Sequence, residues 1–178
     1  MSGVRNPQRP PATRSKHMSV KNNGVVNHPQ RVVCGIAVDI YSIMIKDLYD
    51  PSAIPGAWRK VWTEFPKSAL PGNSAAYGVS TPIAGTAGQL HYVAGVEVNA
   101  DFVSPAGFEI TTIPAGNYLS LEHVGSIMEL APSYAEAYGV VFPSAGLEMR
   151  EGPHLEIYDA TLDPMTDSYS MGIAIPVK

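Results

Sequence analysis

The chain has 178 residues, of which 45% are hydrophobic and 16% charged, proportions typical of one sizeable globular domain or of two small halves sharing a core. Its apolar runs are too short to span a bilayer and it lacks a hydrophobic signal peptide, so we expect a cytoplasmic protein. Residues 1–31 carry six basic and no acidic side chains, whereas 32–178 carry six basic and 16 acidic ones. The acidic body argues against nucleic acid as its partner.

The basic leader, residues 1–30, is rich in Pro, Asn and Ser and has no apolar periodicity. This composition predicts disorder, and a solvated tail is a better interpretation than an arm that touches RNA or a membrane. The "KHM" at 16–18 also resembles a junction left by an expression vector. We therefore assign the folded domain to residues 31–178.

The first half, about residues 31–100, is predicted to contain strand, helix, strand and strand in that order. The segments are "VVCGIAVDI" (32–40), "IPGAWRKVWTEFPKS" (54–68), "AAYGVST" (75–81) and "YVAGVEV" (92–98). The helix should begin after Pro55 and end near Pro66, and a Gly-rich hairpin at 81–89 joins the last two strands. Cys34, the one cysteine of the chain, is expected to be a core thiol.

The second half, about residues 107–178, repeats this order after one additional strand. Its segments are "GFEITTIPAGNYLSLEHVG" (strand, turn, strand), "SIMELAPSYAEAYGVVFPSAG" (helix), "PHLEIYD" (strand) and "YSMGIAIPV" (strand). Ser126 followed by Glu129 forms a capping-box pattern at the helix start, and Pro132 is expected to kink or split the helix. The strands at 92–98 and 169–175 share the pattern Tyr-x-x-Gly-aliphatic-x-aliphatic, which indicates an internal repeat.

As a set, these segments resemble the GyrI-like family, the bacterial effector-binding domain that also occurs in AraC-type and MerR-type regulators. The matching segments, over about residues 31–178, are "IPGAWRKVWTEF", "AYGVS", "YVAGVEV", "FEITTIPAGNYLSLEHVGSIMEL", "HLEIYD" and "YSMGIAIPVK". The resemblance implies an α+β fold of two β-α-β-β (SH2-like) halves related by a pseudo-two-fold axis, with antiparallel sheets, helices packed on them and a ligand groove between the halves. The leader is too short for a helix-turn-helix, so any DNA-binding unit is expected on another chain.

Glu156 lies in the predicted strand 153–159, between Leu155 and Ile157. Alternation alone puts it on an outward face, where most glutamates are solvated. In the family an acidic residue of the matching strand faces the groove, so the resemblance implies that Glu156 is the counter-charge for a lipophilic, cationic small molecule. A carboxylate in an apolar groove is poorly solvated, and a bound cation restores the lost stabilisation.

Six aromatic residues are expected around the groove: Trp58, Trp62, Tyr77, Tyr92, Tyr118 and Tyr158. The two tryptophans are four residues apart and share a helix face, a spacing that is also typical of core residues. The resemblance places the tyrosines at 77, 92 and 118 near the groove, and Tyr158 shares the strand face of Glu156. Each tyrosine could instead be a core residue with its hydroxyl bonded at the rim.

Catalytic and metal-binding motifs are not evident. His123 and Glu122 are adjacent in a predicted strand, so their side chains point to opposite faces and should not share a site. The other four histidines lack metal-ligand spacing, and the sequence has neither a Gly-rich phosphate loop nor a Gly-x-Ser-x-Gly elbow. We expect no cofactor and no metal.

Three functions remain open. The preferred one is a binding protein that takes lipophilic, cationic small molecules such as an effector or a drug. The second, also within the range of the family, is a stand-alone hydrolase of electrophilic small molecules in which Glu156 acts as a general base with a tyrosine partner. The third is a protein-interaction module of the gyrase-inhibitor type, whose acidic body binds a cationic surface. A membrane partner is not expected, and pairing of two copies is left open.

Overall fold

An antiparallel sheet of eight strands forms the centre of the computed structural model, which describes residues 19–66, 68, 75–159 and 170–178. The strands are β1 (Ser19–His28), β2 (Arg31–Tyr41), β3 (Ala76–Pro82), β4 (Gln89–Val98), β5 (Glu109–Ile113), β6 (Gly116–Val124), β7 (His154–Tyr158) and β8 (Ser170–Pro176). Their order across the sheet is β1-β6-β8-β7-β3-β4-β2-β5. The predicted α+β class, with an antiparallel sheet and a few helices, is confirmed.

Within the described residues, helical segments of more than one turn accompany the sheet in two places. They are α1 (Ala53–Glu64) and a run made of the 3-10 turn η2 (Ile127–Glu129), α2 (Leu130–Glu136), the π-helical turn η3 (Ala137–Val141) and α3 (Phe142–Ser144). Pro55 and Pro132 each lie in the first turn of their helix, where a missing N–H costs little. Consequently α1 begins before Pro55 rather than after it, and α2 runs through Pro132 without being split there. None of the helices within the described ranges is long and apolar enough to cross a bilayer.

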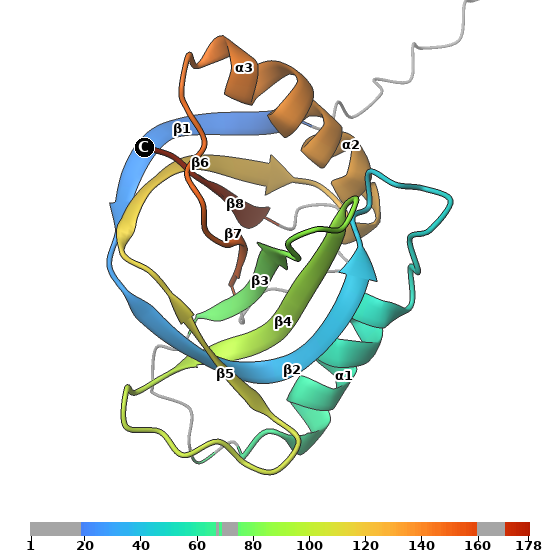
Figure 1. The fold of residues 1–178 in the computed structure, drawn as a ribbon, viewed down its shortest axis with the longest axis vertical. Coiled ribbons are helices and arrows are strands. Elements are labelled where there is room, and N and C mark those ends of the chain that lie inside the picture. The colour runs from blue at the N-terminus through green and yellow to red at the C-terminus, as the bar shows by residue number, and fades with distance from the viewer. Residues whose placement is uncertain (1–18, 67, 69–74, 160–169) are drawn as a thin grey trace, which may run out of the picture.

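Two short connections join strands that stand far apart in the sheet order. Pro29 and Gln30 link β1, at one edge, to β2, and Pro114 and Ala115 link β5, at the other edge, to β6. Because a connection of two residues spans three Cα–Cα steps and so reaches only about 10 Å, the sheet has to curl until its ends approach each other. Figure 1 shows the result as a nearly closed ring with α1 on its outside. Both strands predicted within 107–125 are present. They do not pair with each other, because β5 pairs with β2 and β6 pairs with β1 and β8.

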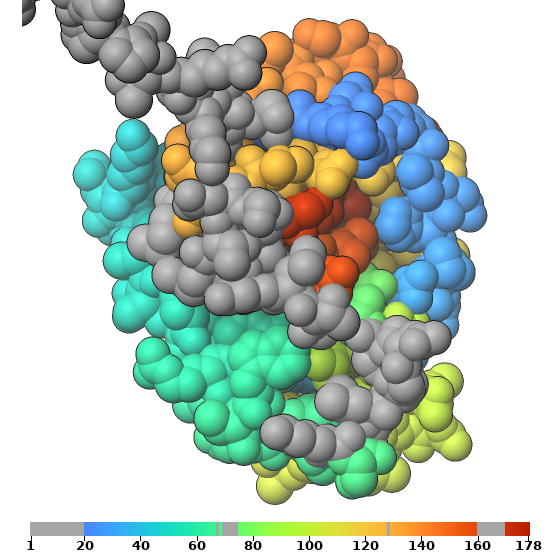
Figure 2. Space-filling view, turned by 180° about the vertical axis from the view of Figure 1, so that it is seen from behind, coloured from blue at the N-terminus to red at the C-terminus, as the bar shows by residue number. Residues whose placement is uncertain are grey.

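Strand β1 lies in a segment that the sequence assigned to the disordered leader. Residues 19–28, expected to be disordered, pair with β6 from Ser19↔Val124 to His28↔Gly116, and Figure 2 shows this blue strand beside β6. A bulge with Gly24 at φ 80° interrupts the ladder and breaks the alternation that would have marked a strand. The pairing partner lies about 100 residues away, so the local sequence carries little sign of it. The predicted disorder of 1–18 lies outside the described residues.

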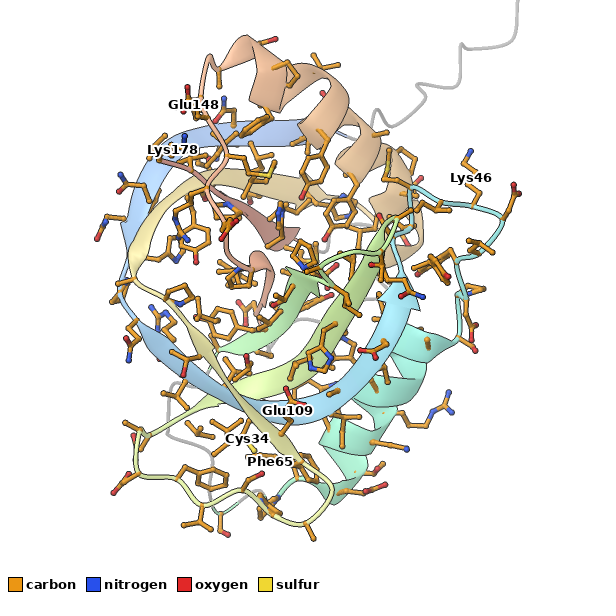
Figure 3. The ribbon with its side chains drawn as sticks, in the orientation of Figure 1. Cys34, Lys46, Phe65, Glu109, Glu148 and Lys178 are labelled. Carbon is orange, nitrogen blue, oxygen red and sulfur yellow. The ribbon has the colours of Figure 1, made fainter. Side chains whose placement is uncertain are left out.

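The sheet separates two apolar clusters. One lies on the helix-facing side and includes Cys34, which is fully buried as predicted and lies near Phe65 at the end of α1 (Figure 3). The other lies on the inner face, inside the ring, and includes Tyr77, Tyr118 and Leu155. Because successive strand residues point to opposite faces, the strands β2, β3, β4, β6, β7 and β8 each contribute to both clusters.

Candidate functional site

A cavity of about 1040 Å³ lies on the helix-facing side of the sheet, between α1, the β2–α1 connection and α2. Strands β4 and β7 contribute Tyr92, Glu156 and Tyr158 to it, and the helices contribute aromatic side chains. Cavities that take drug-sized molecules have about this volume and a similar, mainly apolar lining with a few polar groups. Several of its polar groups gather around one carboxylate.

Glu156 is that carboxylate, and only 5% of the residue is exposed. The hydroxyls of Tyr92 and Tyr158 each donate a hydrogen bond to Oε2 at 2.7 Å, and the Tyr134 hydroxyl donates one to Oε1 at 2.7 Å. The indole Nε1 of Trp58 in turn donates to the Tyr92 hydroxyl oxygen at 3.0 Å. Side chains from α1, α2, β4 and β7 thus converge on a single negative charge.

The hydroxyls remain donors at neutral pH. Burial, and then the negative charge of Glu156, holds the pKa of Tyr92, Tyr134 and Tyr158 well above its usual value. Glu156 forms no ion pair with a lysine or arginine of the described residues. Lys46, on the nearby β2–α1 connection, projects away from the molecule in Figure 3. The buried charge is therefore stabilised by hydroxyl dipoles and lacks a cationic partner within the described chain.

Gly78 provides the space for this arrangement. It lies directly opposite Glu156 in the β3–β7 register. A Cβ atom at this position would overlap both Oε2 of Glu156 and the Tyr92 hydroxyl. The absence of a side chain on β3 therefore allows the carboxylate and the phenol to meet above the centre of the sheet.

Two pairs of stacked aromatic rings form opposite walls of the cavity. Trp58 and Trp62 of α1 lie 5.5 Å apart at 19°, and Tyr134 and Tyr138 of the second helical run lie 6.1 Å apart at 12°. Both pairs are four residues apart, so each shares one face of its helix. Trp58 also meets Tyr158 edge to face at 5.0 Å, whereas Trp62 is 48% exposed. All four rings line the cavity.

A second polar pair lines the cavity beside Glu156. The Tyr138 hydroxyl and Nδ1 of His154 are 2.6 Å apart. His154 precedes Glu156 by two residues on the same face of β7, and burial lowers the pKa of His154 to about 4. The imidazole is therefore neutral at pH 7.

This lowered pKa predicts a pH-dependent stability. Between pH 6.5 and about 4 the unfolded chain protonates His154 while the folded protein does not, so the free energy of unfolding should fall as the pH is lowered through this window, by up to about 1.4 kcal/mol per pH unit. Urea unfolding at pH 7, 6, 5 and 4.5 would measure it. The neutral variant His154→Asn should show a shallower fall. Equal slopes for both proteins would contradict the assignment, because all other titrating groups are shared.

The structure brings five of the seven predicted site residues to the cavity: Trp58, Trp62, Tyr92, Glu156 and Tyr158. Tyr77 and Tyr118 do not line this cavity, because they face the inside of the ring instead. There the Arg31 guanidinium lies over the Tyr77 ring at 5.9 Å and that of Arg150 over the Tyr118 ring at 4.6 Å. Tyr77 adjoins Gly78, which shares the face of Glu156, so alternation places its side chain on the opposite face.

The sequence prediction missed Tyr134, Tyr138 and His154. A signal for the tyrosines was present, since they repeat in the second helix the four-residue spacing of Trp58 and Trp62. His154 could have been found from its position two residues before Glu156, which predicts a shared strand face.

His123 and Glu122 do not share a site, as predicted. The His123 ring is buried and bonded through Nδ1 to the Ser133 hydroxyl at 2.7 Å and through Nε2 to the Ser126 carbonyl at 3.2 Å. Glu122 points the other way and pairs with Lys21. His123 thus fixes the start of α2 against β6 and has no ring nitrogen left for chemistry. Within the described ranges, no group of three His, Cys, Asp or Glu side chains is arranged to hold a metal ion.

Comparison with known proteins identifies a family and a curated relative. A family model described as the GyrI-like small molecule binding domain matches residues 39–178. The transcriptional regulator BrlR of Pseudomonas aeruginosa is 31% identical over 91 residues, which make up 51% of this chain and 34% of the regulator. The match thus spans about a third of the length of that relative.

Several solved structures share the fold. SAV2435 bound to tetraphenylphosphonium has a TM-score of 0.69 at 16% identity, over 89% of this chain and 94% of that one. An integron cassette protein of Vibrio cholerae has a TM-score of 0.64 at 16% identity, over 89% and 99% of the two chains. A putative bacterial transcription regulation protein of Staphylococcus aureus MU50 has 0.65 at 17% identity, over 91% and 99%. At these identities the likeness establishes the fold alone.

Proposed function

We propose that the chain, which belongs to the GyrI-like small molecule binding domain family, binds lipophilic cations. The ligand lies in the cavity between α1 and α2, and Glu156 is its counter-charge. The observation that carries the proposal is a buried carboxylate, in an aromatic cavity, that has no cationic partner among the described residues. A buried charge without a partner is costly, and a bound cation offsets that cost.

The walls of the cavity support the same class of ligand. The rings of Trp58, Trp62, Tyr134 and Tyr138 line it, and each well-placed ring contributes roughly 0.5–2 kcal/mol of attraction to a cation. Delocalised or shielded organic cations have a low cost of desolvation and gain from both the rings and the carboxylate. Tetraphenylphosphonium, which is bound to SAV2435 in its solved structure, belongs to this class.

The hydrogen bonds of Glu156 favour binding over hydrolysis. Three tyrosine hydroxyls occupy acceptor positions on its two oxygens. A general base would offer those positions to a water molecule. The proposal is therefore a binding protein, and the relation to BrlR supports an effector-binding role within transcriptional regulation. DNA binding in such a system would come from another domain or chain.

The proposal retains the two predicted halves, about residues 31–100 and 107–178. The sheet order supports them, because β2, β4 and β3 follow one another on one side of the centre as β6, β8 and β7 do on the other. A pseudo-two-fold axis would then pass between β3 and β7, where Gly78 lies opposite Glu156. The ligand would sit at the junction of the halves.

The charge requirement can be tested with two ions of the same shape. Tetraphenylphosphonium and tetraphenylborate are nearly equal in size and carry opposite charges. We expect calorimetric titration to show the phosphonium binding at least tenfold more tightly, since Glu156 attracts one ion and repels the other. Equal affinities would leave a hydrophobic cavity without charge selection and would overturn the proposal.

A further inference from the structure

We propose that His154 is a second recognition point of the cavity, whose Nε2–H donates a hydrogen bond to an acceptor oxygen on the ligand. This inference rests on the proposed function, because it takes the cationic centre of the ligand to lie at Glu156. It narrows the ligand class to lipophilic cations that also carry a carbonyl, ether or similar acceptor at a defined distance from the charge.

The contact with Tyr138 favours one position of the ring proton. The Tyr138 hydroxyl lies 2.6 Å from Nδ1, and burial raises the pKa of this phenol, which therefore keeps its proton. A phenol O–H is a strong donor and the unprotonated nitrogen of a neutral imidazole is its acceptor. When Nδ1 accepts this bond, the single proton of the ring is carried by Nε2. His154 is neutral at pH 7 because burial lowers its pKa to about 4.

The Nε2–H group is open to the cavity. Nε2 of His154 forms no hydrogen bond with the described residues, although Nδ1 does. Among the described residues, the side-chain nitrogens that are both fully buried and without a hydrogen-bond partner belong to Arg31 and Arg150. Nε2 of His154 also has no partner within the described chain but is not one of these nitrogens, so it is not fully buried. His154 lines the cavity, and we infer that its second ring nitrogen is reached from that space. A donor in this position gains a partner only when a ligand or a water brings an acceptor.

The strand sets the distance between the two recognition points. His154 and Glu156 are alternate residues of β7, and alternate residues of a strand lie about 7 Å apart on one face. The carboxylate is largely occupied by tyrosine hydroxyls and acts on the ligand through its charge. His154 offers the directional contact that the carboxylate does not. A matching ligand carries its acceptor about 7 Å from its cationic centre.

A matched pair of probes tests this inference. Pentyltriphenylphosphonium and (4-oxopentyl)triphenylphosphonium carry the same charge and rings, and differ by one carbonyl on the fourth carbon of the chain. The measured quantity is the ratio of their dissociation constants. We expect the preference for the ketone to be about threefold to tenfold larger in the wild-type protein than in His154→Asn, which keeps an acceptor near Nδ1 but has no donor at Nε2.

Two controls separate this inference from the proposed function. His154→Gln, whose amide nitrogen can occupy the place of Nε2, should restore the preference for the ketone. Glu156→Gln should weaken both probes alike. Identical ratios of the dissociation constants in the wild type and in His154→Asn would overturn the inference. If both probes still bound tightly, the proposed function would be unaffected by that result. Failure of the wild-type protein to bind either probe would overturn both.

A second measurement does not depend on the folding of a variant. In wild-type protein labelled with ¹⁵N at histidine, the ketone probe should shift the Nε2–H resonance of His154 more than the pentyl probe does. Equal shifts with the two probes would also overturn the inference.

Discussion

In the Glu156→Gln variant we expect tetraphenylphosphonium to bind more than tenfold more weakly than in the wild-type protein, with the fold intact. The substitution keeps the shape of the side chain and an oxygen that can accept from the tyrosines. It removes the charge, and a charge pair about 4 Å apart is worth about 4 kcal/mol at an effective dielectric constant of 20. The loss should therefore exceed the roughly 1.4 kcal/mol that corresponds to a factor of ten.

The matched control is Glu148→Gln. Glu148 pairs with Lys178 on the surface, as Figure 3 shows, and its side chain is 74% exposed. This substitution changes the net charge by the same amount at a distance from the cavity. Calorimetric titration of both variants would separate a local contact from a general field effect. Equal losses in the two variants, or no loss in Glu156→Gln, would contradict the role of Glu156.

Gly78→Ala should lower both the stability of the protein and its affinity for cations. Its Cβ would overlap Oε2 of Glu156 and the hydroxyl of Tyr92. The Tyr92 ring is fully buried and cannot move aside freely, so the hydrogen bond between these groups should break. We expect the free energy of unfolding to fall by about 1–3 kcal/mol and cation binding to be lost.

Gly56→Ala provides the comparison for that change. Gly56 lies in α1 and nothing stands within 4 Å of an added Cβ, so the same chemical change meets open space. Because alanine has the higher helix propensity, this variant should be as stable as the wild type or more stable, and should still bind cations. Urea unfolding and titration of both variants would measure the difference. A Gly78→Ala protein that binds normally would show that the contact between Tyr92 and Glu156 is dispensable.

The sequence predicts the elements of this fold well because each carries a local signal. The alternation in β2, β4 and β8 and the aromatic spacing in α1 mark their structure without knowledge of their neighbours. Pairing is different, because it depends on residues that are distant in the chain. The strand β1 and the contact of β5 with β2 both arise from such pairing, and neither has a local pattern.

The candidate site could be predicted where its residues follow the alternation of side chains between the two faces of a strand. Glu156 and Tyr158 share one face of β7, and the family resemblance implied that this face lines the groove. Tyr77 was assigned to the groove by resemblance although its adjacency to Gly78 places it on the inner face. Tyr134 reaches Glu156 only because α2 packs over the sheet, a tertiary relation that spacing alone does not give.

The two short connections across the ring bear on how the chain folds. Strand β1 completes an edge beside β6, and β5 completes an edge beside β2, so each end of the sheet is covered by a strand from the distant part of the sequence. Ser19 meets Val124, a separation that gives the topology a high contact order. During synthesis β1 is made before its partner β6, and about 100 further residues must be added before the two strands can pair. We therefore expect slow, all-or-none folding of the whole domain rather than stepwise folding of independent repeats.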